Sequence, residues 1–371
     1  MTEQYAHITG WGMSVPERIL TNDDLAKMVD TNDEWIRDRT GIQERHIAAD
    51  NETTASLASE AALNALRMAK VPPSEIDLII VSTSSPEHLF PSTASLVQDR
   101  IGAEFAGAFD LSAACTGFIF ALNMASQSIR SGSVKNALVI GSETLSRMVD
   151  WTDRNTCILF GDGAGAFVLQ AHEEPGGVLS SIMRSDGSGG DLLSVPAGGS
   201  AAPTTNQTIL EGQHYIQMNG REVFRFATRV MANASKEAIS KANLEVEDIN
   251  IIIPHQANLR IIEAAARGLK LPMDKFAVNV NKYGNTSTAS IPLATVEAVE
   301  EGRLKRGDKV VFVGFGAGLT WGALTVQWTG PFSTEEPFKL ARYQRTARLR
   351  SFWRRIQRFF AGIFFGRGRS G

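Results

Sequence analysis

The segment "ASLASEAALNALRMAKVPPSEIDLIIVST" (residues 55–83) decides the fold class, because its pattern occurs twice in the chain. It predicts an amphipathic helix, a turn marked by prolines and a buried strand, "IDLIIVS". The segment "TRVMANASKEAISKANLEVEDINIIIPHQAN" (228–258) has the same order, with "INIIIP" as its strand. The two strands start at Ile76 and Ile249, so the offset is 249 − 76 = 173 residues.

A second pair of strand-like segments has the same offset. "NALVIGSET" starts at Asn136 and "KVVFVGFGAG" at Lys309, and 309 − 136 is again 173. Helical segments that alternate with short Val/Ile-rich strands are typical of α/β proteins, and a duplication of this length favours two similar halves packed together over a solenoid. The alternative is that ordinary helix-turn-strand units recur without duplication. We predict three parts, at residues 1–172, 173–330 and 331–371.

The composition is that of a globular protein. Of the 371 residues, 43% are hydrophobic and 21% charged, and the chain is long enough for two domains. Its start is unlike a signal peptide, no apolar run reaches the ~18 residues of a membrane span, and two cysteines make no disulfide framework. We therefore expect a cytosolic protein. Neither a metal-ligand spacing nor a P-loop is present, so we expect no metal.

The extension 331–371 is basic. It holds ten Lys and Arg and two Glu, a charge of +8, so the net charge of −3 leaves −11 for residues 1–330. In 338–365, Leu, Tyr, Phe, Trp and Ile recur at three- and four-residue steps with arginines between them, which predicts a basic amphipathic helix suited to an anionic membrane surface. Packing on the body or disorder are the alternatives. Nucleic acid is disfavoured because the acidic body would repel phosphates.

One cysteine lies where a nucleophile would be expected. In "AFDLSAACTGFIFALNMA" (108–125), Cys115 follows small residues and precedes an apolar run that predicts a buried helix. A helix N-terminus stabilises a thiolate, although a lone cysteine is more often a small buried hydrophobe. Adding 173 to 115 gives Thr288, in "YGNTSTASIPLAT" (283–295), which also precedes an apolar run. We therefore predict two helix starts that face each other between the halves.

Two further residues complete a candidate catalytic set. His255 directly follows the strand "INIIIP", and α/β folds place catalytic groups at the carboxyl ends of strands. Asn285 follows a glycine, in a turn that can aim an amide. Each alone would more often be structural, whereas Cys, His and Asn together favour catalysis. Cys157 lies in a strand-like apolar run, "NTCILFGDGAG" (155–165), and is predicted to belong to the core.

Seven stretches carry a family resemblance. They are "DEWIRDRTGIQERH", "FDLSAACTGF", "GDGAGAFVL", "MNGREVF", "PHQANLRI", "GNTSTASIP" and "GFGAGLTWGALTVQW", and they run in one order from Gly10 to about Trp328. In these stretches the chain closely resembles the β-ketoacyl-acyl-carrier-protein synthases III, condensing enzymes of the thiolase superfamily that start fatty acid synthesis. The resemblance implies an internally duplicated αβαβα thiolase-like fold, a homodimer and no cofactor.

The resemblance also implies a mechanism with Cys115, His255 and Asn285 as the triad. Thiolate Cys115 would attack a short acyl-CoA, such as acetyl-CoA, and form an acyl-enzyme. Malonyl-acyl-carrier protein would then lose CO2 while His255 and Asn285 donate hydrogen bonds to its thioester oxygen. The backbone N–H groups of Cys115 and Ala317 would form the oxyanion hole for the acyl group.

By the same resemblance, further residues would bind the substrates. The CoA site would comprise Trp35, Arg39, Thr40, Arg154, Met218, Gly220 and Asn258. Phenylalanines would surround the acyl pocket: Phe90, Phe160 and Phe315. Carrier-protein docking would use Arg225, Gln256, Arg260 and Arg267. One alternative is a related synthase that makes a specialised product with another donor or acceptor, and a second is an inactive scaffold that acts through its tail.

Overall fold

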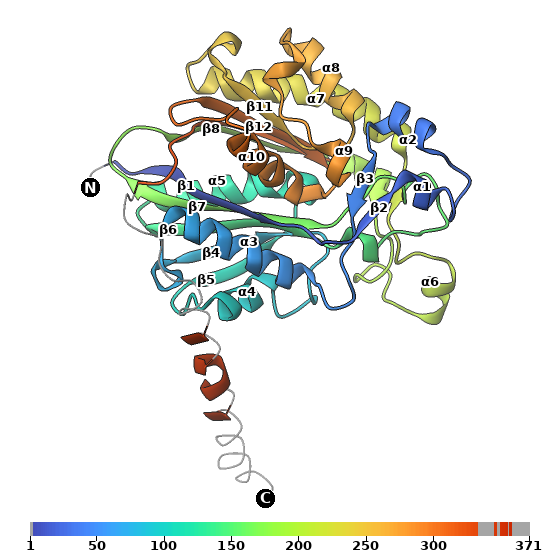
Figure 1. Ribbon diagram of the computed structural model, residues 1–371, viewed down its shortest axis with the longest axis horizontal. Helices are drawn as coiled ribbons and strands as arrows, with labels where there is room; N and C mark the ends of the chain where they lie inside the picture. Colours follow the sequence, from blue (N-terminus) through green and yellow to red (C-terminus); the bar gives the residue numbers. More distant parts are fainter. Residues whose placement is uncertain (1–2, 333–344, 347–348, 355, 358–371) are drawn as a thin grey trace, which may run out of the picture.

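The computed structural model describes residues 3–332, 345–346, 349–354 and 356–357. Two sheets lie one above the other, with helices between them and on both outer faces (Figure 1). The first sheet has the order β1-β7-β6-β4-β5, with strands Tyr5–Ser14, Gly163–His172, Asn136–Glu143, Leu78–Ser82 and Gly107–Leu111. The second has the order β11-β12-β13-β8, with strands Ile251–Pro254, Lys309–Gly316, Thr320–Gln327 and Gly177–Ser185.

The main helices form three layers around these sheets. The helices α3 (Thr54–Ala69) and α4 (Thr93–Ile101) cover the outer face of the first sheet, and α7 (Gly220–Lys241) and α8 (Leu259–Leu269) cover that of the second. Between the sheets lie α5 (Gly117–Arg130) and α10 (Ser290–Glu300). This αβαβα arrangement confirms the predicted fold class.

Alternating side chains explain why both sheets are buried on two faces. In β6, Ala137 and Val139 pack with α5 and α10, whereas Leu138 and Ile140 pack with α3. Because side chains of a strand alternate between faces, a continuous apolar run such as "NALVIG" feeds two cores at once.

The 173-residue offset is present in the structure. The short 3-10 turn η2 (Ala114–Thr116) leads into α5, and η7 (Ser287–Ala289) leads into α10, each pair of starts 173 residues apart. Ala114 and Ser287 even share a left-handed backbone, with φ of 46° and 49°. The two turns contact each other between the sheets, so the predicted pair of facing helix starts is confirmed.

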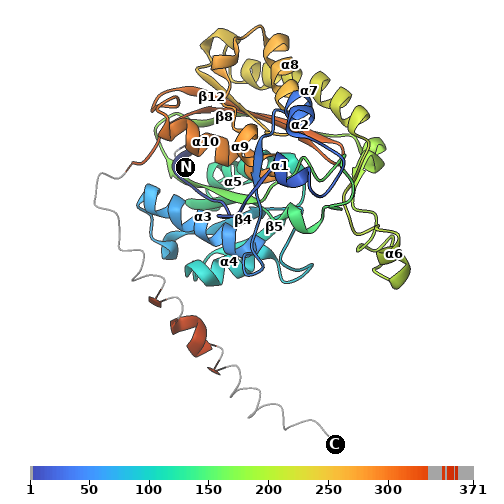
Figure 2. The ribbon, with the colours of Figure 1, turned by 45° about the vertical axis from the view of Figure 1, so that its right-hand side comes forward.

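Smaller elements surround one end of the central layer. These are β2 (Ile19–Thr21), β3 (Glu44–His46), α1 (Asn22–Leu25), α2 (Asp33–Thr40), β9 (Leu193–Ser194), β10 (Gln217–Met218), α6 (Asn206–Leu210) and α9 (Val280–Tyr283). Further 3-10 turns are η1 (Pro73–Glu75), η3 (Leu145–Arg147), η4 (Gly187–Leu192), η5 (Val246–Asp248) and η6 (Met273–Lys275). Figure 2 shows α6 projecting from this end of the molecule. The predicted division after residue 172 falls in the link between β7 and β8.

Candidate active site

A mainly apolar cavity of about 190 Å³ lies at the start of α5. Cys115 and Ala114 line it from η2, and Ser287 lines it from the matching turn of the other half. Its remaining lining residues come from loops and small elements: Ser84, Leu145, Met148, Phe160, Leu193, Ser194, Val195, Ile216 and Ala317. The duplication therefore creates the cavity where its two central helix starts meet.

The backbone around Cys115 is arranged to receive negative charge. A Cβ added to Gly316 would lie 2.7 Å from the Cys115 nitrogen, so only glycine lets β12 approach this closely. Among the described residues, neither the Cys115 N–H nor the Ala317 N–H donates to an acceptor elsewhere in the chain. Ala317 has no left-handed φ, so alanine fits here without strain. Two free N–H groups beside a nucleophile are what an oxyanion hole requires.

Burial controls the protonation of the Cys115 thiol. Burial raises the pKa of Cys115 to about 12, hydrogen bonding from Ser287 opposes the rise, and the nearby Glu143 carboxylate raises it further. The loss of water around the sulfur therefore outweighs the stabilisation that a helix N-terminus gives to a thiolate. In this buried site the thiol form of Cys115 is favoured over the thiolate.

Glu143 is a buried carboxyl group that the sequence did not point to. It accepts hydrogen bonds from the Thr83 hydroxyl, the Ser84 and Ser85 N–H groups and the Ser85 hydroxyl, at 2.6–3.2 Å. Burial raises the pKa of Glu143, and these donors oppose the rise. The carboxyl group thus fixes residues 83–85, including Ser84 on the cavity wall.

His255 is buried and held in one tautomer. Its Nδ1 lies within hydrogen-bond distance of Ser290 Oγ, at 2.7 Å. The same oxygen accepts a weak hydrogen bond from the Gln256 N–H at 3.3 Å. No other acceptor for the Ser290 hydroxyl exists among the described residues, so this hydroxyl donates to Nδ1 and the ring proton resides on Nε2. Burial lowers the pKa of His255 to about 3, which keeps the ring neutral.

The Nε2 atom of His255 is buried and has no partner among the described residues. An unpaired buried donor is costly unless a ligand uses it. His255 also lies next to Cys115 across β12, because a Cβ on Gly314 would lie 3.4 Å from His255 Cβ and 3.7 Å from the Cys115 carbonyl oxygen. His255 is therefore suited to donate a hydrogen bond beside Cys115.

Asn285 is aimed by the turn that the sequence predicted. Its Oδ1 accepts a hydrogen bond from the Ser287 N–H at 2.8 Å, after Gly284 has turned the chain with a φ of 62°. Its backbone pairs with Phe160 in a parallel bridge, which places it beside the cavity wall. Because Oδ1 is occupied, the Asn285 amide N–H groups are the part left to serve a ligand.

The three predicted acyl-pocket phenylalanines lie in different places. Phe160 lines the cavity, and Phe315 packs edge-on against His255, with 5.4 Å between ring centroids. Phe90 does not line the cavity of its own chain, and its side chain is 86% exposed. Cys157 is buried as predicted, although in a turn and not in a strand, and burial raises its pKa to about 11.

The residues expected to bind CoA gather near the small elements. The Arg39 and Arg154 guanidinium groups lie 4.5 and 5.2 Å from the centre of the Trp35 ring. A flat base inserted between Trp35 and Arg154 would need about 3.5 Å on each side, a total of about 7 Å between the ring and the guanidinium. The present distance is 5.2 Å, so Arg154 must move before a base can enter. Asn258 caps α8 and donates to the Arg39 carbonyl oxygen at 2.8 Å, which joins the two halves here.

Other members of that set differ in accessibility. Thr40 is buried, and its hydroxyl donates to the Ile36 carbonyl and accepts from the Ile42 N–H. Met218 pairs with Leu193 of the cavity wall, and Gly220 has open space around it apart from the Met218 side chain.

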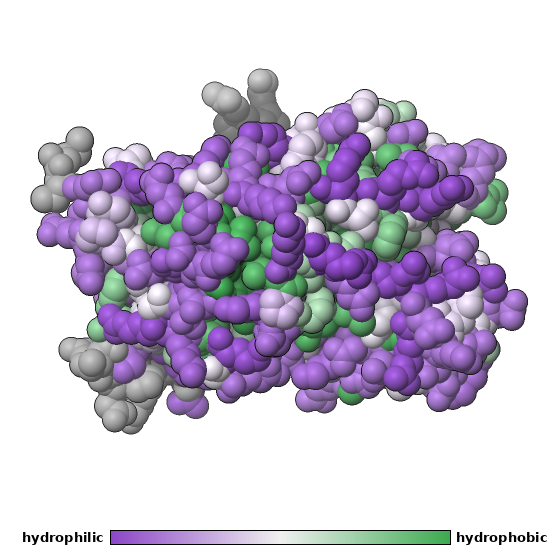
Figure 3. Space-filling model, turned by 90° about the horizontal axis from the view of Figure 1, so that it is seen from above, coloured by the Kyte–Doolittle hydropathy of each residue, from purple (hydrophilic) through white to green (hydrophobic). Residues whose placement is uncertain are grey.

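The set predicted to dock the carrier protein needs one correction. Arg225, Arg260 and Arg267 are exposed on α7 and α8, and this outer face is largely hydrophilic around an apolar centre (Figure 3). Gln256, in contrast, is buried, donates to two backbone carbonyls and accepts from two backbone N–H groups. Its amide is fully used inside the protein, so Gln256 cannot meet a docked protein.

One sequence signal would have found two of the overlooked residues. The offset of 173 connects Ala114 with Ser287 and Gly117 with Ser290, so the second copy places hydroxyl groups where the first has small residues. The cavity residues of the loops, such as Ile216 and Val195, carry no comparable signal.

The duplicated five-layer fold, with a cysteine at one central helix start and a histidine and an asparagine beside it, defines a thiolase-fold enzyme. Models of the 3-oxoacyl-[acyl-carrier-protein (ACP)] synthase III family match residues 109–187, and those of its C-terminal part match residues 239–328. The β-ketoacyl-[acyl-carrier-protein] synthase III of Symbiobacterium thermophilum is 55% identical over 321 residues, 86% of this chain and 97% of the relative.

Solved structures agree with these matches. The 3-oxoacyl-[acyl-carrier-protein] synthase III of Aquifex aeolicus has a TM-score of 0.81 at 48% identity and covers 87% of this chain and 100% of its own. The priming β-ketosynthase of the R1128 polyketide pathway has a TM-score of 0.82 at 34% identity, over 89% of this chain and 98% of its own. The chain therefore belongs to the β-ketoacyl-[acyl-carrier-protein] synthase III family. It is an acyltransferase of the condensing type, which sets the inactive-scaffold alternative aside.

Proposed function

We propose that this enzyme joins a short acyl-CoA to malonyl-acyl-carrier protein through an acyl-Cys115 intermediate. The unpartnered Nε2 of buried His255, next to Cys115, is the observation that carries the proposal. In the first step the Cys115 sulfur attacks the acyl thioester while the Cys115 and Ala317 N–H groups stabilise the oxyanion. The C–S bond to CoA breaks, and the thiol proton leaves on the CoA sulfur.

The second step forms the new carbon–carbon bond. The malonyl group loses CO2, and the enolate oxygen accepts hydrogen bonds from His255 Nε2–H and the Asn285 amide. The carbanion then attacks the acyl carbonyl, the thioester bond to Cys115 breaks, and the released thiolate takes a proton from water that enters as the product leaves. Negative charge develops on oxygen in both steps, so fixed donors provide most of the catalysis, and losing one typically costs ~10²- to 10³-fold in rate. No cofactor takes part in the proposed reaction.

Intact-protein mass spectrometry tests the nucleophile directly. Wild type should gain the mass of an acyl group from at least one member of an acyl-CoA panel and lose it again when malonyl-acyl-carrier protein is added. Cys115→Ser should gain no mass, whereas Cys157→Ser should behave as wild type because Cys157 lies outside the cavity. Labelling of Cys115→Ser equal to wild type would refute the proposal.

We propose that CoA binds with its adenine on Trp35. The two guanidinium groups next to the ring, and the packing of Trp35 on the same apolar cluster as Met148 and Leu193 of the cavity wall, support this. Trp35→Ala should raise KM for the acyl-CoA and leave KM for malonyl-acyl-carrier protein unchanged. Equal effects on both substrates would contradict it.

We propose that the carrier protein docks on the exposed arginines of α7 and α8. Arg225 and Arg267 are partly neutralised by Glu222 and Glu263, and the Arg260 guanidinium lies over the Phe224 ring, 5.5 Å from its centre. Arg260→Glu should raise KM for the carrier substrate, and the rise should shrink in salt as charges are screened. An unchanged KM would contradict docking at this face.

We propose a homodimer that forms along β5. This strand is the edge of its sheet, and the large apolar side chains of Leu89, Phe90, Phe105 and Phe109 are exposed near it. Phe90 can then reach an acyl pocket only in the partner subunit. Phe105→Glu should shift the sedimentation coefficient to that of a monomer, and an unchanged dimer would refute this interface.

A synthase of a specialised product remains a second candidate. The R1128 priming β-ketosynthase shares this fold, with a TM-score of 0.82, so the same fold also serves a polyketide pathway. An enzyme that acylates Cys115 but never reacts with malonyl-acyl-carrier protein would support this alternative against the first.

A further inference from the structure

The family models end at residue 328, and the S. thermophilum relative accounts for 321 of the 371 residues. The segment after residue 330 is therefore an addition to the condensing enzyme. The described residues 345–346, 349–354 and 356–357 are helical, and we call them the tail helix. The rest of the segment predicted as an amphipathic helix, 338–365, lies outside the described residues. Figures 1 and 2 both show the tail helix beyond the α3 and α4 layer.

The tail helix contacts the body with its polar side. Arg350 and Arg354 both pair with Glu104, the first at 2.9 Å, and the Ser351 hydroxyl donates to Asp99 at 2.8 Å. These three tail residues lie within one side of a helix, about 100° of rotation per residue. The attachment is thus made of charge and hydroxyl contacts.

The apolar side of the same helix is left open. Leu349, Phe352 and Trp353 are 60%, 57% and 59% exposed. They have the i, i+3, i+4 spacing of one helical face, and Ile356 continues the series at i+7. A helix that had evolved to pack on its own body would bury this face, so these contacts argue against the packing alternative.

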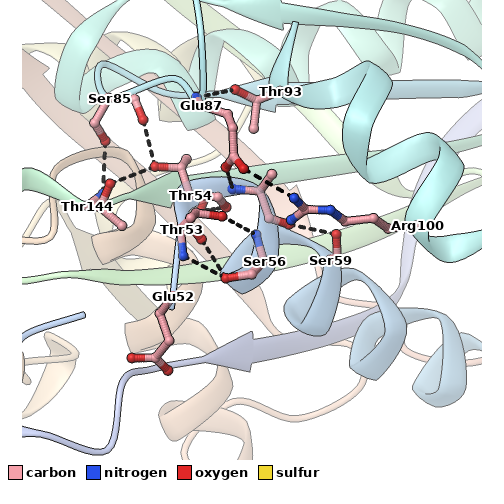
Figure 4. Close-up of polar contacts among 12 residues, drawn as sticks. Glu52, Thr53, Thr54, Ser56, Ser59, Ser85, Glu87, Thr93, Arg100 and Thr144 are labelled. Atoms are coloured by element: carbon pink, nitrogen blue, oxygen red, sulfur yellow. Dashed lines mark hydrogen bonds and ion pairs between the residues drawn. The ribbon is translucent and has the colours of Figure 1, made fainter. Parts of the chain in front are cut away.

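The body surface opposite the tail helix is a poor partner for that apolar face. A hollow of about 680 Å³ lies between α3 and α4, and Phe352 forms part of its wall. The described body residues that line it are polar except for Leu63. Some of its polar groups pair with one another or with neighbours, as Figure 4 shows: Ser56 with Thr53, and Arg100 with Glu87 at 3.1 Å. Among the described residues, Leu63 is therefore the one large apolar side chain of the body that lines this hollow beside Phe352.

We propose that the tail helix binds the surface of an anionic phospholipid membrane, with Leu349, Phe352 and Trp353 inserted at the level of the headgroups. Charge complementarity selects this partner: the extension carries +8 and the body −11, so the extension is attracted to acidic lipid while the body stays in water. Aromatic side chains on one face and arginines on the other are typical of interfacial helices. In the described residues no helix is long and apolar enough to span a membrane.

The contacts with Glu104 give the proposal a second consequence. Lipid phosphates and the Glu104 carboxylate compete for the same two guanidinium groups, Arg350 and Arg354. Glu104→Gln should therefore strengthen binding to anionic vesicles severalfold. The matched control is Glu247→Gln, which changes an exposed acidic residue far along the chain from the tail contacts and should leave vesicle binding unchanged.

Vesicle co-sedimentation of the full chain is the test. Full-length protein should pellet with vesicles of phosphatidylcholine mixed with phosphatidylglycerol, and at least about tenfold less with phosphatidylcholine alone. The double variant Phe352→Glu, Trp353→Glu should lose at least about tenfold in partitioning, since two apolar side chains no longer leave water. Leu210→Glu replaces a leucine of α6 that is 82% exposed, more than the tail residues, and this variant should bind as wild type.

The same experiment separates this proposal from its rivals. Equal pelleting of the intact chain and of a chain ending at Gly330 would refute the proposal. Wild-type pelleting of the double variant would also refute it, because the membrane would then attract the tail by charge alone. Tighter binding to a single-stranded oligonucleotide than to anionic vesicles would also overturn it. A change of oligomeric state in the double variant would identify a second copy as the cover of the apolar face. The chain ending at Gly330 should keep its condensing activity without vesicles. A failure of the proposed condensing activity can therefore be distinguished from a failure of the proposed membrane binding.

Discussion

Replacing Ser290 by alanine should slow condensation without slowing acylation. The Ser290 hydroxyl lies 2.7 Å from His255 Nδ1 and fixes the tautomer that places a proton on Nε2. Its removal leaves Nδ1 buried and unpaired, which costs about 1–2 kcal/mol, and the ring can then carry its proton on the wrong nitrogen. If that cost falls on the transition state, the rate drops about five- to thirtyfold.

The two half-reactions distinguish this role from a general loss of packing. Acylation of Cys115 uses the Cys115 and Ala317 N–H groups, so Ser290→Ala should accept an acyl group from acyl-CoA at nearly the wild-type rate in single-turnover mass spectrometry. Release of the β-ketoacyl product after addition of malonyl-acyl-carrier protein should be slow. The matched control is Thr295→Val, which removes another buried hydroxyl of α10, one whose acceptor among the described residues is the Ile291 carbonyl. Equal slowing of both half-reactions in Ser290→Ala, or none in either, would refute the reasoning.

Three further predictions concern the same site. Because burial raises the pKa of Cys115 to about 12, its alkylation by iodoacetamide should still be rising at pH 9, and a plateau below pH 8 would contradict the resting thiol. His255 has its pKa lowered from 6.5 to about 3, so the unfolded chain binds this proton more readily. Its contribution to stability is present above pH 6.5 and is lost as the pH falls toward 3, by up to about 1.4 kcal/mol per pH unit. In urea unfolding, the free energy of unfolding of His255→Gln should fall less with decreasing pH than that of wild type. The same pH dependence in both proteins would contradict a neutral buried ring. Gly316→Ala would place a Cβ 2.7 Å from the Cys115 nitrogen, so it should destabilise the protein by about 1–3 kcal/mol and nearly abolish acylation. Gly199→Ala, where a Cβ meets no atom within 4 Å, should do neither.

The sequence determined the repeat and therefore the fold. Strand and helix periodicity are local properties, and a fixed offset between two copies can be counted along the chain, as for the strands that became β4 and β11. It also located Cys115, His255 and Asn285 at a helix start, a strand end and a turn, because such positions are marked by neighbouring residues. The basic, aromatic-rich composition of the extension is likewise a property of sequence alone.

Tertiary structure decided everything that depends on what surrounds a side chain. The sequence placed Gln256 on a docking surface, but residues distant in the chain bury it. The raised pKa of Cys115 likewise comes from residues that surround the sulfur only in the folded chain. Ser290 holds His255 across 35 residues of sequence, and no local pattern reveals that contact. Only the structure showed that the tail helix meets Glu104 with its arginines and leaves its apolar face open, because a sequence defines the two faces of a helix and not the surface each one meets.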